Sequence, residues 1–320
     1  MAQASVAIRN AVREQLERCE AGDCILVAVS GGADSLALAY ATLVESAPLA
    51  IRAVAVTIDH QLQEKSADQA AKVEKQLREM GYQDVVVAKV KVSLESGLEA
   101  GARNARYEAL ERIAIEKSAV KVLLGHTRDD QAESVLLGLA RGSGTRSLSG
   151  MASENGIYLR PLLSLTRAQT EAACTEFGIE YWNDPHNENL DFSRVRVRLE
   201  VLPVMEEQIG PGIAAALARS AALLRDDADA LDEIAQKEMT ALDPAQLDCE
   251  HLASLARAIR SRILRAAIYA AGAPSGSITA DHLAAVEALV TSWRGQGAIS
   301  LPGGVKVERI SGRLSLLAQP

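Results

Sequence analysis

The segment that most constrains this chain is an apolar run that passes through a Gly-Gly turn into an alanine-rich stretch. Residues 24–44 read CILVAVSGGADSLALAYATLV. A short β-branched run predicts a buried strand, and Ser30 and Ser35 place hydroxyls beside the expected start of a helix. A strand, a glycine turn and a helix N-terminus in succession favour an α/β sheet with an anion cradle at its edge.

The two glycines of this turn let the backbone come close to a ligand. Gly31 and Gly32 leave successive N–H groups free to face a pyrophosphate. The turn matches neither GxxxxGK[ST] nor GxGxxG, and it contains Asp34, which would repel polyphosphate unless a divalent cation stood between them. We therefore predict that Asp34 is a Mg²⁺ ligand. An ordinary turn capped by Ser and Asp stays the alternative.

Strand-like runs alternate with helix-period segments as far as about residue 186. The runs are CILVAVS, IRAVAVTIDH, DVVVAKVKV, VKVLLGH and IYLRPLL. This alternation predicts a doubly wound parallel sheet. Gly81 and Gly178 stand where left-handed C-caps would end two of the helices.

The sequence pattern changes beyond about Pro203, where long segments rich in Ala and Leu predict helices. Three are expected, over residues 213–239, 251–272 and 278–293, and Pro-Gly-Gly and Ser-Gly breaks near the end predict a terminal hairpin or meander. We expect two domains, 1–203 and 204–320, of which the second is smaller and mainly helical with a short terminal β segment.

Composition narrows the class of partner. The 34 Lys and Arg against 42 Asp and Glu give a net charge of −8, which disfavours a protein that coats polyanions. Aromatic residues make up only 3%, so a nucleic-acid contact would depend on charge and hydrogen bonds rather than broad stacking. Four scattered cysteines without a CxxC pair, and no long apolar run, predict a soluble cytoplasmic protein without a membrane segment.

Polar side chains follow two of the predicted strands. Thr57, Asp59 and His60 end the second strand beside the Gly-Gly turn, where open α/β sheets bind ligands, and we predict contacts to adenine and ribose. His126 and Asp130, four residues apart, lie where a later strand enters a helix, so both can point into the same crevice. Helix capping would explain each of these residues as well.

Arginines form the remaining candidates. Arg103 and Arg106, with Tyr107, share one helical face suited to phosphate, although a solvated face with neighbouring glutamates would look similar. Two later groups could hold an RNA backbone. They are Arg194, Arg196 and Arg198 near the domain junction, and Arg257, Arg260, Arg262 and Arg265 on a helix where a solvated face is the stronger alternative.

Several motifs, in order, resemble the tRNA(Ile)-lysidine synthetase family of PP-loop ATP pyrophosphatases. The matching segments, within roughly residues 25–205, are SGGADSLAL, DHQL, LEAGARNARY, HTRDDQAESVLLGLARGSG, SGM at 149–151, RPLL at 160–163 and VRVRLEVLP. SGGxDS alone marks only the superfamily. The HxxDDQAE…LxRGSG block together with ARxxRY makes the resemblance specific to the family.

The resemblance implies an adenine nucleotide alpha hydrolase-like domain that uses ATP and Mg²⁺. The O2 atom of the wobble cytidine in tRNA(Ile) with a CAU anticodon would attack the α-phosphate, and pyrophosphate would leave. The amine of free L-lysine would then displace AMP from C2, which gives lysidine and changes the tRNA identity from methionine to isoleucine. The ATP-binding residues expected here are Val29, Ser30, Gly31, Gly32, Ala33, Asp34, Ser35, Thr57 and Asp59.

Catalytic roles are expected for five side chains. Asp34 and Asp130 would carry the metal or orient the lysine ammonium, and Arg103, Arg106 and His126 would stabilise developing charge. The helical domain would contact the tRNA, and a homodimer is left open. Another PP-loop ligase or a tRNA thiolase is the competing enzyme, although thiolases of this group usually need clustered cysteines. A catalytically idle nucleotide-binding module that docks to RNA is the non-enzymatic alternative.

Overall fold

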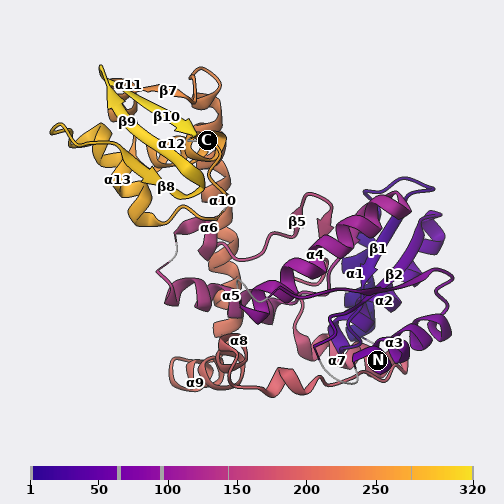
Figure 1. Cartoon of the computed structure of the whole chain (residues 1–320). Coiled ribbons are helices and arrows are strands. Elements are labelled where there is room, and N and C mark those ends of the chain that lie inside the picture. Colours follow the sequence, from indigo (N-terminus) through magenta and orange to yellow (C-terminus); the bar gives the residue numbers. More distant parts are fainter. Residues whose placement is uncertain (1–2, 63–65, 94–96, 143, 275, 319–320) are drawn as a thin grey trace. The chain divides into compact units, whose positions relative to one another are not determined.

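The computed structural model describes residues 3–62, 66–93, 97–142, 144–274 and 276–318. The chain divides into two compact units, Met1–Leu224 and Arg225–Pro320 (Figure 1). The boundary falls inside helix α10 (Ile213–Met239), beyond the position expected from the change in sequence texture. The assignment of separate roles to residues 1–203 and 204–320 stays a prediction.

A six-stranded sheet in the order β3-β2-β1-β4-β6-β5 forms the centre of the first unit. All neighbouring strands run parallel except the antiparallel edge pair β5 and β6. The five predicted strands are confirmed, and the edge strand β5 is an addition. The strands are β1 (Cys24–Ala28), β2 (Arg52–Asp59), β3 (Val85–Lys89), β4 (Ala119–Leu123), β5 (Glu154–Asn155) and β6 (Tyr158–Leu159).

Helices cover both faces of this sheet, as a doubly wound fold requires (Figure 1). Alternate residues of β1 enter two separate cores. Ile25 and Val27 pack with α1, α2, α3 and α7, whereas Leu26 packs with α4. The helices and short turns are α1 (Gln3–Leu16), α2 (Ala33–Ser46), η1 (Ala47–Leu49), α3 (Ser66–Met80), α4 (Leu98–Lys117), α5 (Arg128–Ala140), α6 (Thr145–Leu148), α7 (Arg167–Phe177) and η2 (Pro185–Glu188).

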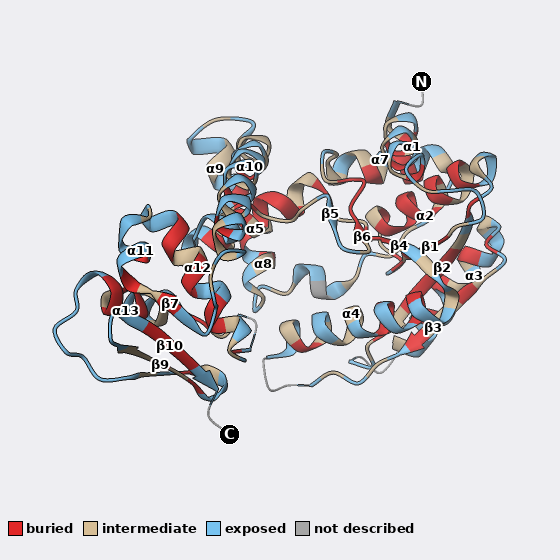
Figure 2. Cartoon of the chain, turned by 90° about the horizontal axis from the view of Figure 1, so that it is seen from above, coloured by how far each residue is buried: buried red, intermediate tan, exposed pale blue. Residues whose placement is uncertain are grey.

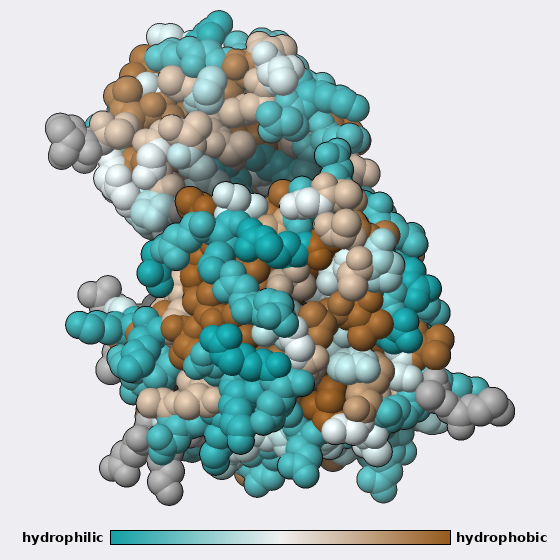
Figure 3. Space-filling view, turned by 90° about the vertical axis from the view of Figure 1, so that its right-hand side faces the viewer, coloured by the Kyte–Doolittle hydropathy of each residue, from teal (hydrophilic) through white to brown (hydrophobic). Residues whose placement is uncertain are grey.

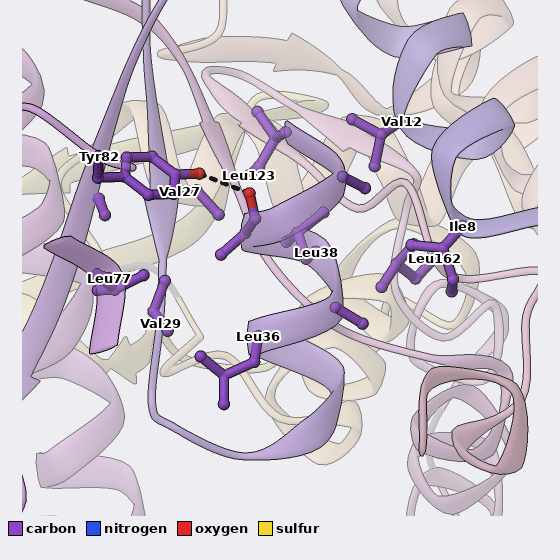
Figure 4. Close-up of a cluster of buried hydrophobic side chains, with 14 of the residues drawn as sticks. Ile8, Val12, Val27, Val29, Leu36, Leu38, Leu77, Tyr82, Leu123 and Leu162 are labelled. Atoms are coloured by element: carbon purple, nitrogen blue, oxygen red, sulfur yellow. Dashed lines mark hydrogen bonds between the residues drawn. The ribbon is translucent and has the colours of Figure 1, made fainter. Parts of the chain in front are cut away.

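The first core is almost entirely aliphatic, as the low aromatic content requires. Figure 4 shows Leu36 and Leu38 of α2 close to Val27 and Val29 of the first strand region. The buried Tyr82 hydroxyl donates a 2.7 Å hydrogen bond to the Ala39 carbonyl, which satisfies the polar end of a large side chain. Buried residues concentrate in the strands and on the inward sides of the helices (Figure 2).

Two predicted helix ends are confirmed by their backbone angles. Gly178 is the C-cap of α7 with φ 70°, and Gly81 follows α3 with φ 117°. These positive angles favour glycine because a Cβ would clash with the backbone.

A nearly continuous helix carries the chain out of the sheet region. It consists of α8 (Ser193–Arg196), the π-helical turn η3 (Val197–Val201) and α9 (Leu202–Gln208). Pro203 lies in the first turn of α9, and it has no N–H to offer the preceding turn. The wider turn immediately before it accommodates this missing hydrogen bond within the helix.

The second unit packs helices against a four-stranded antiparallel sheet in the order β7-β10-β9-β8. The predicted terminal hairpin is confirmed as β9 and β10, and β7 and β8 extend it. The helix expected over residues 251–272 is wrong as one element, because Leu255 and Ala256 are extended, with ψ 150° and 141°. The elements are β7 (Gln246–Asp248), α11 (Cys249–Ser254), α12 (Arg257–Ala270), α13 (Ala280–Thr291), β8 (Ile299–Leu301), η4 (Pro302–Gly304), β9 (Val305–Ile310) and β10 (Arg313–Ala318).

Two arginines of α12 form ion pairs with acidic side chains of the second unit. Arg260 donates from Nε and Nη2 to Glu287 at 3.0 and 2.9 Å, and both side chains are buried. Arg262 donates to Asp232 at 2.5 Å. These ion pairs hold α12 to its neighbours, so Arg260 and Arg262 are poor candidates for an RNA backbone.

The exposed surface mixes hydrophilic areas with smaller apolar patches (Figure 3). Ile115, Ile209 and Leu223 are among the exposed apolar side chains. Within the part of the chain that the structure describes, the helices are too short or too polar to cross a lipid bilayer.

Candidate active site

The Gly-Gly turn leads from β1 into α2 as predicted. Ser35 organises it, because its Oγ accepts the Ser30 N–H at 3.1 Å and donates to the Gly32 carbonyl at 2.9 Å. Gly32 is the N-cap of α2 and has no side chain to bond the first N–H groups of the helix. Those N–H groups therefore remain available to a phosphate at the positive end of the helix dipole.

Gly31 turns the loop in a conformation that a side chain would not tolerate. Its φ is 91°, and an added Cβ would lie 2.7 Å from Cγ2 of Val73 in α3. Its carbonyl accepts the Trp182 N–H at 2.9 Å, so the segment before η2 is joined to the loop. A Cβ added at Gly32 would have Ser30 Oγ, at 3.8 Å, as its nearest neighbour.

We predict that Gly31→Ala and Gly32→Ala separate folding from phosphate binding. Gly31→Ala should lower the free energy of unfolding by about 1–3 kcal/mol because of the positive φ and the contact with Val73. Gly32→Ala should cost less stability and still weaken ATP binding, because its Cβ would stand where a phosphate approaches. Urea denaturation and nucleotide titration of both variants measure this, and equal stability losses would contradict it.

A cleft of about 690 Å³ opens at the carboxyl edge of the sheet, within the first unit. It brings together nearly all the side chains that the sequence proposed. The predicted residues that line it are Val29, Ser30, Gly32, Ala33, Asp34, Ser35, Thr57, Asp59, Arg103, Arg106, His126 and Asp130. Gly31, the remaining residue of this set, is not part of the lining, and its positive φ shapes the loop.

The end of β2 contributes polar groups to this cleft. Thr57 and Asp59 are buried, and Oδ1 of Asp59 accepts the Gln61 N–H at 2.9 Å. Asp59 thus closes the turn after the strand as well as lining the cleft. Nδ1 of His60 is buried without a hydrogen-bond partner among the described residues. Burial, with the nearby Arg106 charge, lowers the pKa of His60.

A basic wall of the cleft comes from α4 and the end of β4. Arg103 and Arg106 lie 5.1 and 5.5 Å from the Tyr107 ring centre, and both guanidinium groups line the cleft. Nε of Arg106 and Nδ1 of His126 are buried and lack partners among the described residues. Unsatisfied buried groups of this kind are costly, so their position suggests that a ligand completes their hydrogen bonds.

His126 is neutral at physiological pH. Burial, reinforced by the Arg106 charge and only partly opposed by Asp130, lowers the pKa of His126 to about 3. It therefore acts as a neutral hydrogen-bonding group, whereas Arg103 and Arg106 supply the positive charge of this wall.

Three carboxylates, Asp34, Asp130 and Glu133, form what we call the acid cluster. Asp34 and Asp130 line the cleft, whereas Glu133 is fully buried. Each is held by specific donors. Asp34 accepts from the Thr170 hydroxyl and from Arg167 Nε at 3.4 Å. Asp130 accepts the Thr127 N–H at 2.8 Å and Arg167 Nη2 at 3.1 Å. Asp130 thus caps α5 and also lines the cleft.

Glu133 is fully buried and is held between two arginines. Arg194 Nε lies 2.7 Å from Oε2, and Arg198 Nε lies 2.6 Å from Oε1. The sequence offered both arginines as possible contacts to an RNA backbone. In the structure they pair with this carboxylate of α5 and also line the cleft. Arg196 is exposed and donates to the carbonyls of Leu190 and Asp191. All three stay candidate RNA contacts, and Arg194 and Arg198 also neutralise Glu133.

We predict that Arg198→Ala destabilises the protein more than Arg196→Ala. Removing Arg198 leaves the buried Glu133 with one close counterion, which should lower the free energy of unfolding by about 2–4 kcal/mol. Arg196→Ala removes only exposed hydrogen bonds and should cost less than about 1 kcal/mol. Urea denaturation of the two variants provides the comparison. Equal losses would mean that the pair with Glu133 does not stabilise the fold.

Burial and charge move the two cleft aspartates in opposite directions. Burial raises the pKa of Asp34, and its bonds to Thr170 and Arg167 offset this only in part. Burial would also raise the pKa of Asp130, but Arg167 and Arg194 outweigh it and hold that pKa below its usual range. Within the described part of the chain no group of three or more metal-ligating side chains occurs. Asp34 and Asp130 offer two hard oxygen ligands, which is the number of carboxylates that Mg²⁺ takes from a protein when substrate phosphates supply the rest.

Sequence reasoning missed Glu133, Arg167 and Thr170. Glu133 follows Asp130 by three residues on α5 and therefore shares its face, which is a signal the spacing contained. Arg167 and Thr170 belong to the first turn of α7, and nothing in the local sequence shows that this turn meets the Gly-Gly loop.

Comparison with known proteins identifies the family of this chain. A family model described as a PP-loop domain matches residues 4–205, and one described as a TilS substrate binding domain matches residues 247–315. A tRNA(Ile)-lysidine synthase from Thermobifida fusca is 51% identical, with 97% of each chain covered. The chain belongs to the tRNA(Ile)-lysidine synthase family. The synthase of Streptomyces coelicolor is 50% identical, with 91% of this chain and 84% of the relative covered.

The PP-loop domain implies that this family member binds ATP. A solved structure with a similar fold is the U34-tRNA thiolase NcsA from Methanococcus maripaludis with its [4Fe-4S] cluster. Its TM-score is 0.56 at 18% identity, with 68% of this chain and 78% of that chain covered, so the likeness concerns the fold. Cys24, Cys174 and Cys249 are buried and Cys19 is half-buried, and all four are free thiols.

Proposed function

We propose that this lysidine synthase family member joins lysine to C2 of the wobble cytidine in tRNA(Ile) with a CAU anticodon. The cytidine O2 attacks the α-phosphate of ATP, pyrophosphate leaves, and lysine then displaces AMP from C2. The observation that carries the proposal is the convergence of the glycine loop, the basic wall and the acid cluster on one cleft, in a chain 51% identical to a tRNA(Ile)-lysidine synthase.

The glycine loop and the basic wall serve the adenylation step. Ser30, Gly32 and the first N–H groups of α2 hold the departing pyrophosphate. Arg103 and Arg106 stabilise negative charge that builds up at phosphorus, and His126 contributes a neutral hydrogen bond. A ligand group bonded to Arg106 Nε and His126 Nδ1 would also satisfy both atoms.

The acid cluster serves the cation and the second step. Asp34 and Asp130 would hold Mg²⁺, which supplies charge neutralisation at the phosphates. Asp130 would also orient the lysine amine, whose nucleophilic form requires loss of a proton. The low pKa of Asp130 keeps it ionised and so able to attract an ammonium group.

Incubation of the purified protein with ATP, labelled L-lysine and CAU-anticodon tRNA(Ile) tests the reaction. Labelled lysine should appear in the tRNA, with AMP and pyrophosphate as products. A tRNA carrying a GAU anticodon is the matched control and should stay unlabelled. Adenylation without lysine transfer would favour another PP-loop ligase or a thiolase, and the absence of ATP–pyrophosphate exchange would favour the idle binding module.

Two partner assignments stay proposals. The second unit, which matches the TilS substrate binding domain over residues 247–315, is proposed to contact the tRNA outside the anticodon. A homodimer is the other proposal, and light scattering of the purified chain tests it.

A further inference from the structure

We propose that Arg167 is a positioning residue that holds Asp34 and Asp130 together in the place a divalent cation takes when nucleotide binds. The inference rests on the proposed metal role of these two aspartates. It assigns to Arg167 a function that the loop and the basic wall do not supply.

The geometry places one guanidinium between the two carboxylates. Arg167 Nε lies 3.4 Å from Oδ2 of Asp34, and Nη2 lies 3.1 Å from Oδ1 of Asp130. Arg167 is the first residue of α7, and its backbone N–H donates to Oδ2 of Asp129 at 2.8 Å. The backbone is thus anchored, and these two ion pairs hold the side chain in place.

The other two arginines that contact the acid cluster pair mainly with Glu133. Arg194 and Arg198 make their short contacts with Glu133, at 2.7 and 2.6 Å, and each lies 3.7 Å from Oδ1 of Asp130. Arg167 is farther from Glu133, at 3.7 Å. Glu133 is therefore neutralised by Arg194 and Arg198 without Arg167. Among the described residues, Asp34 forms its ion pair with Arg167.

Electrostatics then requires Arg167 to move when the cation arrives. A guanidinium and a divalent cation cannot share a position close to the same two carboxylate oxygens, because like charges at that distance repel strongly in a partly buried site. Asp34 keeps its hydrogen bond from the Thr170 hydroxyl, so its carboxylate stays in position when the guanidinium leaves. The Arg167 side chain lines the cleft, where the phosphates of bound ATP offer it a new anionic partner.

Manganese binding to the nucleotide-free protein tests this directly. Mn²⁺ titration followed by electron paramagnetic resonance should show binding about tenfold tighter in Arg167→Gln than in wild type, because the competing cation is gone. Arg198→Gln is the matched control. It makes the same change of charge in the same cluster but does not free Asp34, so its shift should be much smaller. Arg167→Lys retains the charge and should bind Mn²⁺ within about threefold of wild type.

A wild-type measurement keeps the test decisive if Arg167→Gln does not fold. The Nε–H resonance of Arg167, assigned by its loss in Arg167→Lys, should shift when Mg²⁺ is added to protein already saturated with a non-hydrolysable ATP analogue. An unchanged resonance would overturn the proposal, as would equal Mn²⁺ shifts in Arg167→Gln and Arg198→Gln. Absence of Mn²⁺ binding even with nucleotide would reject the metal role of the aspartates together with this inference. Lysidine formation by the same preparations reports separately on the ligase function.

Discussion

Replacement of Asp34 by asparagine is expected to reduce pyrophosphate release by roughly 10²-fold or more, because it removes a charged oxygen donor from the phosphate end of the cleft. The change is nearly isosteric, and the Thr170 hydroxyl can still donate to the remaining carbonyl oxygen. The fold should therefore survive. ATP–pyrophosphate exchange, measured across a Mg²⁺ titration, gives the effect.

The controls separate a metal role from general damage. Thermal unfolding should show a folded Asp34→Asn protein. Glu171→Gln removes the same charge from another side chain that lines the cleft and should leave exchange near normal. A Mg²⁺ requirement displaced to higher concentration would support the assignment of Asp34. Near-normal turnover at ordinary Mg²⁺ would show that Asp34 is not a metal ligand.

Replacement of Asp130 by asparagine is expected to separate the two half-reactions. Lysidine formation should fall by roughly 10²-fold or more, because a carboxylate that attracts and orients an ammonium in a partly desolvated crevice contributes mainly to the attack step. Adenylation should fall much less, since it depends chiefly on the loop, Asp34 and the Arg103–Arg106 pair. The adenylated tRNA should therefore accumulate in single-turnover experiments with labelled ATP and excess lysine.

Asparagine is preferred to alanine here because Asp130 has a second task. Its Oδ2 accepts the Thr127 N–H and completes the capping box of α5, which an amide oxygen can continue to do. Alanine would remove the cap as well, at a cost of about 1 kcal/mol. Equal loss of both half-reactions in Asp130→Asn would instead mean that Asp130 serves the cation alone, and it would place lysine recognition elsewhere.

The sequence by itself determined the sheet and the position of the loop. Period-two and continuous apolar runs predict strands because side chains alternate across a sheet, and β1 indeed divides Ile25 and Leu26 between two cores. Polar residues at strand ends predict a ligand edge because parallel strands end together. These are local or nearly local rules, and so the loop, Thr57, Asp59, His126 and Asp130 were all found.

Only the tertiary structure decided which charges meet. Arg167 lies 133 residues beyond Asp34, and Arg194 lies 61 residues beyond Glu133. Nothing in the local spacing distinguishes an arginine that pairs with a buried carboxylate from one that faces solvent, because both occur on amphipathic helices. The sequence accordingly offered Arg194 and Arg198 as possible RNA contacts and gave no sign of their pairing with Glu133. Packing of α7 and α8 around α5 and the loop keeps water away from the carboxylates of the acid cluster. A buried carboxylate requires a nearby counterion, and these arginines supply it.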